Sequence, residues 1–354
     1  MSRLVFWRLA RAGLAIWTLA SVVFLLSHRD AGAAVQEALA EVSDVQTDRT
    51  ATTSAERLAA QAAVRERLGL NMPLFYISQG SNQQEPTWQW NGLHNQYHQW
   101  ATGLLHGDLG TSYRNGQPVA SRLGAALSFT LPLTGTAAVL AILAALALAQ
   151  RLAASPWWQR PVRTLLVTVH ALPLFVVALV LLLAFANPDA FAWFPAYGLD
   201  QPADVGSGTW SQIATYLMHM ALPVSALTIT AIPELTLQLD AALTQELHAD
   251  YATTARAKGL DEGAVIRHHA LRNALLPTLT QIAELLPALV AGAVVVEVVF
   301  ALPGMGRLLA EAAAARDYPV LVGGILLTGA ARLLALLLAD LFYFWADPRI
   351  RWQS

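Results

Sequence analysis

The feature that most constrains this chain is a series of long apolar segments that carry very few charges. Of its 354 residues, 55% are hydrophobic and only 13% are charged, whereas about a quarter of a typical soluble domain is charged. A helix needs about 20 apolar residues to cross a bilayer, and six segments qualify when an occasional polar residue is allowed. They cover residues 4–26, 131–149, 164–186, 213–237, 276–301 and 319–345. The sequence therefore predicts an all-α polytopic membrane protein with six transmembrane helices.

The composition also excludes several classes of function. The chain has no cysteine, which rules out disulfides, thiol catalysis and cysteine-ligated metal sites. Its formal net charge is −2, so no basic field is available for nucleic acid. We find no nucleophile–base set on the spans, and we expect no catalytic residue, cofactor or metal in this chain.

The short loops predict which side of the membrane each segment faces. Arginine or lysine is frequent near the N-terminus, in residues 151–163, in residues 238–275 and after the last span, whereas residues 187–212 contain three Asp and no basic residue. Basic loops stay in the cytoplasm. Both termini are therefore expected inside, as in a multi-pass protein of the bacterial inner membrane.

This orientation predicts four regions. They are an N-terminal transmembrane helix (1–27), a periplasmic segment (28–128), a five-helix core (129–347) and a cytoplasmic tail (348–354). Within the periplasmic segment, the Ala-rich residues 31–67 favour helix, and residues 78–100, rich in Gln, Asn and Trp, are expected to form an ordered polar loop or a flexible insertion.

The cytoplasmic loop 238–275 predicts a helical elbow between the fourth and fifth spans. Helix-forming residues precede Gly259, which suits a left-handed helix end. Asp261 can cap a second helix that runs toward Arg272. Small side chains in this elbow would let another protein approach closely, but a solvated hairpin that merely joins two spans fits the same residues.

Several segments together resemble the permease subunits of ABC importers of the dipeptide, oligopeptide and nickel type. The dense part of the resemblance covers residues 248–352, and weaker matches precede it. The segments are 255–260, 269–277, 292–300, 302–309, 316–320 and 347–351, and, upstream, 66–70, 107–113 and 128–133. Relative to that family, residues 76–93 look like an insertion.

The resemblance implies a subunit that moves peptides or a similar small solute inward and couples closure of ATPases to alternating access. It also implies four partners besides membrane lipid: a second, homologous permease, two cytoplasmic ABC ATPases and a periplasmic substrate-binding protein. ATP and Mg²⁺ would bind to the ATPases, so this chain itself would not be an enzyme. The residues that the resemblance assigns to the ATPase-coupling loop are Asp250, Tyr251, Thr254, Ala255, Arg256, Ala257, Lys258, Gly259, Leu260, His269 and Arg272.

A second group of residues is a candidate for a gate or for the translocation path. Charges within spans are costly unless they face a partner, a cavity or water. Glu297 lies in the family pattern, which favours a structural gate over a binding role, and Arg332 either pairs with Asp340 or meets a substrate carboxylate. Pro303, Gly304 and Gly306 are expected to make a tight turn or a short re-entrant break outside the fifth span, with glycine permitting positive φ.

Two other functions compete with the importer. An intramembrane enzyme would need a nucleophile and a base on the spans. A secondary transporter that works alone would need two similar halves or ion sites near the middle of the bilayer, and the sequence contains no internal repeat of fixed period.

Overall fold

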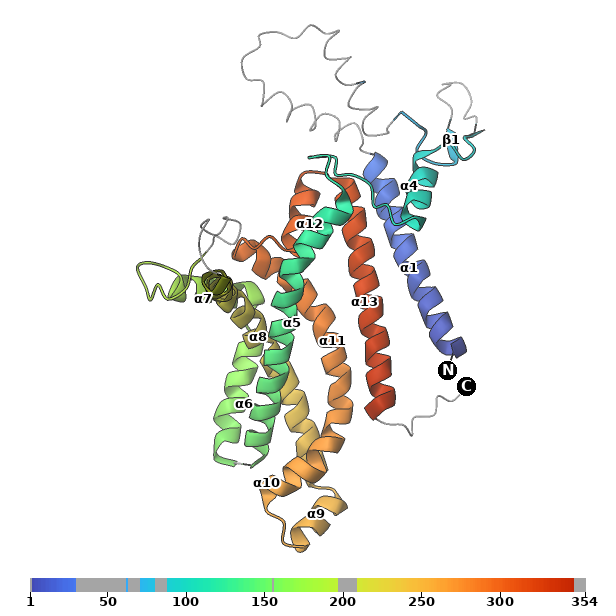
Figure 1. The fold of residues 1–354 in the computed structure, drawn as a ribbon. Helices are drawn as coiled ribbons and strands as arrows, with labels where there is room; N and C mark the ends of the chain where they lie inside the picture. Colours follow the sequence, from blue (N-terminus) through green and yellow to red (C-terminus); the bar gives the residue numbers. More distant parts are fainter. Residues whose placement is uncertain are drawn as a thin grey trace. The chain divides into compact units, whose positions relative to one another are not determined.

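The computed structural model describes residues 2–29, 62, 71–79, 88–154, 156–196 and 209–346. Its helices, traced in Figure 1, are α1 (Ser2–Arg29), α4 (Gln96–Leu105), α5 (Val119–Ala154), α6 (Pro156–His170), α7 (Leu174–Phe185), α8 (Thr209–Leu247), α9 (Asp250–Ala257), α10 (Glu262–Val265), the π-helical turn η1 (Ile266–Ala270), α11 (Leu271–Val299), α12 (Met305–Ala314) and α13 (Tyr318–Ala346). The strands β1 (Ile77–Gln79) and β2 (Trp88–Trp90) pair antiparallel. An all-α membrane fold is confirmed.

The predicted count of six spans is not established by the helices themselves. Among the described residues, α5 and α8 are each long and apolar enough to cross a bilayer, and two bent pairs of helices raise the total to four if each pair is one span. The segments at 9–25 and 318–334 are shorter apolar helices. Pro223 and Pro233 do not interrupt α8, in keeping with the tolerance of proline in membrane helices.

The third predicted span, 164–186, is not one straight helix. It consists of α6, which begins earlier at Pro156, and α7, and the two meet at an angle of 100°. The break lies at residues 171–173. Pro173 has no N–H for a helical hydrogen bond, and its ring disfavours helical geometry at the residue before it, which favours a break here.

The chain divides into two compact units. The first comprises residues 1–125 and 308–331, and the second comprises residues 126–307 and 332–354. The predicted partition by side of the membrane is a different property and stays a prediction. In the second unit, α5, α7, α8 and α11 enclose one apolar core rich in alanine, including Ala137, Ala141, Ala226 and Ala293. Small residues let membrane helices pack closely.

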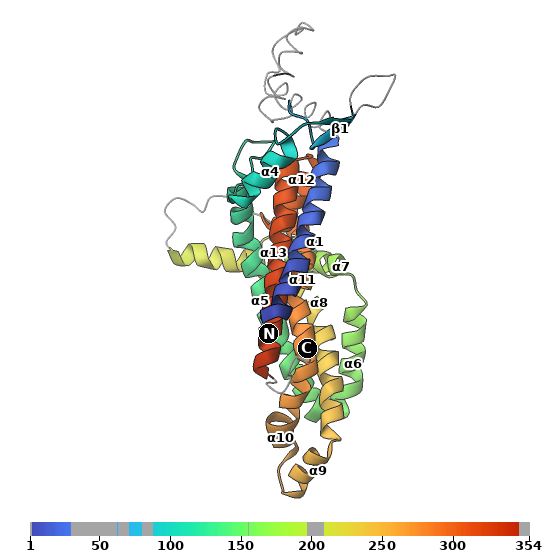
Figure 2. The same ribbon diagram turned by 90° about the vertical axis from the view of Figure 1, so that its right-hand side faces the viewer.

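Both views place α6 beside α8 in the second unit (Figures 1 and 2). Arg163 of α6 forms an ion pair with the buried Asp240 of α8 at 2.7 Å. The middle of α6 and the last third of α8 are therefore in contact in this unit. That the loops around residues 151–163 and 238–275 share one side of the membrane stays a prediction.

The first unit has an aromatic core where the sequence predicted a polar loop. Phe24 of α1 stacks on Trp100 of α4 with ring centroids 4.8 Å apart, and Tyr97 packs against both rings. The described part of residues 78–100 is thus not all loop, because it holds β2 and the start of α4. Asn95 caps α4 by accepting from His98 N at 2.8 Å. The predicted helix at 31–67 falls, apart from Ala62, outside the described residues.

Candidate functional site

The elbow between α8 and α11 has the local structure that its sequence predicts. The short helix α9 ends at Ala257, and Gly259 adopts φ +86°, the left-handed conformation that glycine accepts without strain. Asp261 then caps α10 by accepting from Ala264 N at 3.2 Å. The π-helical turn η1 follows directly and leads into α11. In Figure 1 this elbow lies at the end of the second unit where α8 ends and α11 begins.

Apolar and polar contacts fix the elbow as one body. Ala252 and Ala255 of α9 are buried against Val265 of α10. Arg256 Nε donates to Glu262 Oε1 at 2.7 Å, and Arg256 Nη1 donates to the carbonyl of Leu247 at 2.9 Å. The hydrogen bond to Glu262 is also the main cause that raises the pKa of the Arg256 guanidinium. One side chain thereby joins α9, α10 and the end of α8.

A second contact ties α9 to α8. The hydroxyl of Tyr251 donates to the carboxylate of Glu246, one residue before the end of α8. Burial, with a further contribution from this hydrogen bond, raises the pKa of the Tyr251 hydroxyl, so Tyr251 stays protonated as a donor at neutral pH. A movement imposed on α9 would therefore pass to α8 through Arg256 and Tyr251 without relying on the backbone alone.

Most of the predicted coupling residues lie on the surface of the elbow. Tyr251, Arg256 and Leu260 are half-buried, and the exposed ones are Asp250, Thr254, Ala257, Lys258, Gly259, His269 and Arg272. Ala255 is the exception, because it is 5% exposed and packs inside the elbow. A surface that binds another protein at this position would consist of the other residues.

The carboxylate of Glu297 lies at the other end of α11, completely buried. It accepts from Thr130 Oγ1 at 2.6 Å, from Gly306 N at 2.6 Å and from Arg307 N at 3.1 Å. Thr130 Oγ1 in turn accepts from Met305 N at 2.8 Å. Glu297 therefore supplies the acceptors that the first N–H groups of α12 lack within their own helix, and the positive end of the α12 dipole favours its charge.

The turn between α11 and α12 differs from the predicted one. Neither Gly304 nor Gly306 has positive φ, and the left-handed residue is instead Ala301, with φ +52°. The two glycines are needed for space. A Cβ on Gly304 would lie 2.2 Å from the Glu297 carboxylate, and one on Gly306 would lie 2.4 Å from Cα of Val294. Pro303 sits half-buried in the turn before α12.

Arg332 is not part of either cluster. It is exposed on α13, and the side chain of Asp340, its predicted partner, lies outside what the structure describes. The structure thus unites Glu297, Gly304 and Gly306 in one cluster and leaves Arg332 apart from it.

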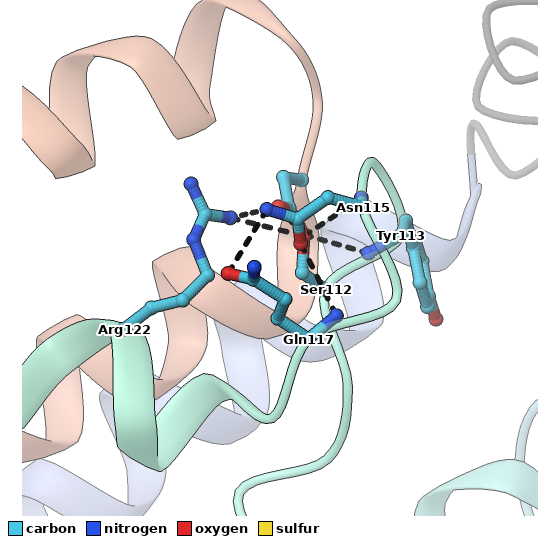
Figure 3. Close-up of polar contacts among 6 residues, drawn as sticks. Ser112, Tyr113, Asn115, Gln117 and Arg122 are labelled. Atoms are coloured by element: carbon cyan, nitrogen blue, oxygen red, sulfur yellow. Dashed lines mark hydrogen bonds and ion pairs between the residues drawn. The ribbon is translucent and has the colours of Figure 1, made fainter.

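The first unit contains a third polar cluster, which the sequence analysis did not single out. Asp317, 1% exposed, accepts from Ser112 Oγ at 2.5 Å, from Tyr113 N at 3.0 Å and from Arg122 Nη1 at 3.0 Å (Figure 3). Arg122 also donates to Ser112 Oγ. The segments 107–113 and 316–320 resemble the family, but about 200 residues separate them, so the sequence does not indicate that they pair.

Tyr113 adjoins this cluster. Its side chain lines a cavity of about 250 Å³ together with Trp100 and Tyr318. Burial, and secondarily the charge of Asp317, raise the pKa of the Tyr113 hydroxyl to about 12. Ser112, Tyr113 and Arg122 thus fasten the segment before α5 to the start of α13.

Known proteins resemble this chain over most of its length. The dipeptide transport system permease protein of Alkalihalophilus pseudofirmus is 31% identical over 82% of this chain and 86% of its own. The probable D,D-dipeptide transport system permease protein of Escherichia coli is 31% identical over 81% and 83%, and the oligopeptide transport system permease protein of Bacillus subtilis is 32% identical over 73% and 80%.

A crystal structure described as an amino acid ABC transporter with histidines covers 63% of this chain and 94% of its own at 17% identity, and its TM-score of 0.46 is too low to carry an argument. The family described as "Binding-protein-dependent transport system inner membrane component" matches residues 125–352, which include the elbow and the Glu297 cluster. The chain belongs to this family and is the membrane-embedded permease subunit of an ABC importer.

Proposed function

We propose that this permease imports peptides or a similar small solute, and that the elbow formed by α9, Gly259 and α10 binds a separate ATPase subunit. The substrate class rests on the relatives, which are named as dipeptide and oligopeptide permeases. A panel of dipeptides and oligopeptides titrated against the cognate periplasmic binding protein tests it, and failure of every peptide to bind would overturn the peptide assignment.

The elbow carries the mechanistic part of the proposal. The sequence has no Gly-x₄-Gly-Lys-Ser/Thr loop, and its only lysine is Lys258 on the elbow, so ATP hydrolysis belongs to other polypeptides. Arg256 and Tyr251 bind the elbow to α8, and η1 continues into α11. Closure of the ATPases would move the elbow as one body and, through α8 and α11, change access to the path.

We infer the complete assembly and its orientation from the same family logic. Two permeases, this one and a homologous partner, would share one translocation path. Two ATPases would bind on the cytoplasmic side and a substrate-binding protein on the periplasmic side. Both termini would be cytoplasmic. A single cysteine at the exposed Thr253 of this cysteine-free chain should react from the cytoplasm only. Reaction from the periplasmic side of intact cells would overturn the orientation.

Substitution of Gly259 tests the coupling role. No atom lies within 4 Å of a Cβ added there, so a substitution acts through the backbone conformation and not through a clash. Gly259→Val must hold a β-branched residue at φ +86°, which costs about 1 kcal/mol or more. We expect it to lower both co-purification of the ATPases and transport severalfold, while membrane insertion is unchanged.

Gly259→Asn is the matched control, because asparagine accepts the left-handed region far better than valine. We expect near wild-type coupling from it, and only a small loss from Lys258→Ala, since one exposed cation contributes little. Ala255→Arg should disrupt the elbow from within. Wild-type coupling in Gly259→Val would show that the loop is only a connector.

A further inference from the structure

A groove lies between the end of α5 and the start of α6, outside the sites described above. It encloses about 490 Å³ and is lined by Leu148, Arg151, Leu152, Ala154, Trp158 and Val162. Arg151 and Leu152 of α5 follow Leu148 by three and four residues, so the three lie on one face of that helix. Trp158 and Val162 of α6 are four residues apart and likewise share a face. Its lining is apolar except for a single guanidinium, and its volume is in the range of ligand-binding cavities.

That guanidinium is available to a ligand. Among the residues that the structure describes, the Arg151 side chain has no hydrogen-bond or ion-pair partner, whereas Arg163 nearby is paired with Asp240. No acidic residue occurs anywhere in the segment 151–163. The first N–H groups of α6 add positive potential at this place and the last carbonyls of α5 add negative potential, so the two helix ends offset each other and Arg151 supplies the net charge. An anion would therefore be favoured at the mouth of the groove.

The surroundings place this mouth at a membrane surface. Trp157 and Trp158 follow Pro156, the first residue of α6, and are 91% and 66% exposed. Exposed tryptophans of membrane proteins collect at the level of the lipid headgroups, and arginines extend toward the same level. An apolar groove with a cation at headgroup level matches the two chemical parts of a phospholipid.

We propose that the groove binds one anionic phospholipid. The phosphodiester contacts Arg151, and an acyl chain lies along the apolar α5 and α6 faces beside the Trp158 indole. This site selects a lipid over free phosphate because the acyl chain supplies the apolar contact, and it selects an anionic over a zwitterionic lipid because no acidic side chain in 151–163 balances Arg151.

The test measures lipid binding to the complete, delipidated transporter complex by native mass spectrometry. Phosphatidylglycerol and phosphatidylcholine are titrated separately. One arginine near an anionic lipid is worth about 1 kcal/mol, so Arg151→Gln should weaken phosphatidylglycerol binding about fivefold. Phosphatidylcholine binding should fall by less, because the choline ammonium beside its phosphodiester already offsets most of the attraction to Arg151. Arg160→Gln is the matched control. Arg160 of α6 is exposed, as Arg151 of α5 is, but it does not line the groove.

The tryptophan pair gives a second matched comparison. Trp158→Ala should weaken binding of both lipids, whereas Trp157→Ala, whose side chain is outside the lining, should not. Glycerophosphoglycerol and inorganic phosphate should fail to compete. Equal losses from Arg151→Gln and Arg160→Gln would overturn the site in favour of diffuse attraction. Competition by inorganic phosphate, or no bound phosphatidylglycerol because another subunit fills the groove, would overturn it as well. None of these outcomes bears on the elbow or on the transported solute.

Discussion

Glu297 in the second unit and Asp317 in the first unit are two buried carboxylates that are stabilised differently. Each is at most 1% exposed, and each accepts from one hydroxyl and from at least one backbone N–H group. Asp317 also has a cation, Arg122, at 3.0 Å. Glu297 instead takes its remaining donors from the start of α12.

The difference shows two ways of keeping a charge inside a protein. A helix N-terminus offers fixed N–H groups and a partial positive charge, but it must approach the carboxylate closely, which is why Gly304 and Gly306 are needed there. A guanidinium reaches its partner on a flexible side chain, so the backbone need not approach the carboxylate closely. The Glu297 cluster should therefore be sensitive to added volume, and the Asp317 cluster to unbalanced charge.

The largest expected effect is that of Gly304→Ala. Its Cβ would lie 2.2 Å from the Glu297 carboxylate, so the carboxylate must move and lose hydrogen bonds from α12. We expect the free energy of unfolding to fall by about 3 kcal/mol, measured by denaturation in mixed detergent micelles. Transport should fall with it.

Gly135→Ala in α5 is the control, because no atom lies within 4 Å of its added Cβ. Alanine in that helix should be neutral or stabilising, by up to about 1 kcal/mol. If both alanine variants were equally stable, the close approach at Gly304 would not limit stability. The claim that the Glu297 cluster is more sensitive to added volume than the Asp317 cluster would then be wrong.

The next effect separates the two carboxylates by charge. Glu297→Gln replaces an acceptor by an amide whose N–H₂ faces other donors and should cost about 2 kcal/mol. Asp317→Asn should cost a similar amount, because it leaves Arg122 without its counterion. Only the loss from Asp317→Asn can be relieved by changing a second side chain, that of Arg122. The double variant Asp317→Asn/Arg122→Gln should lose about 1 kcal/mol less free energy of unfolding than the sum of the losses of its two single variants.

The matched double variant is Glu297→Gln/Arg122→Gln, in which the two losses should simply add. Relief of Glu297→Gln by Arg122→Gln would show that the two carboxylates are coupled, contrary to the distinction drawn between them. Strict additivity for Asp317 and Arg122 would show that the ion pair contributes nothing beyond the hydrogen bonds of Ser112 and Tyr113.

The sequence predicted these sites unevenly, for physical reasons. Local signals were reliable: Gly259 has the left-handed conformation, and Asp261 caps α10, because both depend on a few adjacent residues. Signals that depend on distant residues were missed or misread. Gly304 suggested a turn with positive φ but is required by a carboxylate seven residues earlier, and nothing in the chain around Asp317 indicates Arg122.

The same limit applies to burial and to helix ends. The family resemblance assigned Ala255 to the coupling loop, where small side chains were expected to let another protein approach, yet it packs against Val265, which lies beyond the turn. The third span could not be divided from hydropathy, since its apolar run continues through Pro173. Patterns of composition predict that a helix exists more readily than where it bends.

The effect that is smallest at neutral pH concerns Tyr113, and it asks whether Asp317 acts through charge or through packing. The pKa of the Tyr113 hydroxyl is raised from 10.0 to about 12, first by burial and then by Asp317. Because the folded state holds this proton more tightly than the unfolded state, stability from this group is complete below pH 10. It is lost as the pH rises from 10 to 12, by up to about 2.7 kcal/mol.

Absorbance of tyrosinate near 295 nm, taken as the difference between the wild type and Tyr113→Phe, measures this ionisation. Asp317→Asn should lower the pKa of Tyr113 by the smaller part of the rise, because burial remains. Ionisation at pH 10 in the wild type would contradict the packing of Tyr113, and a fall to pH 10 in Asp317→Asn alone would make charge the main cause. Only the second outcome would show that Asp317 acts on Tyr113 mainly through its charge, and less through the packing that its contacts with Ser112, Tyr113 and Arg122 organise.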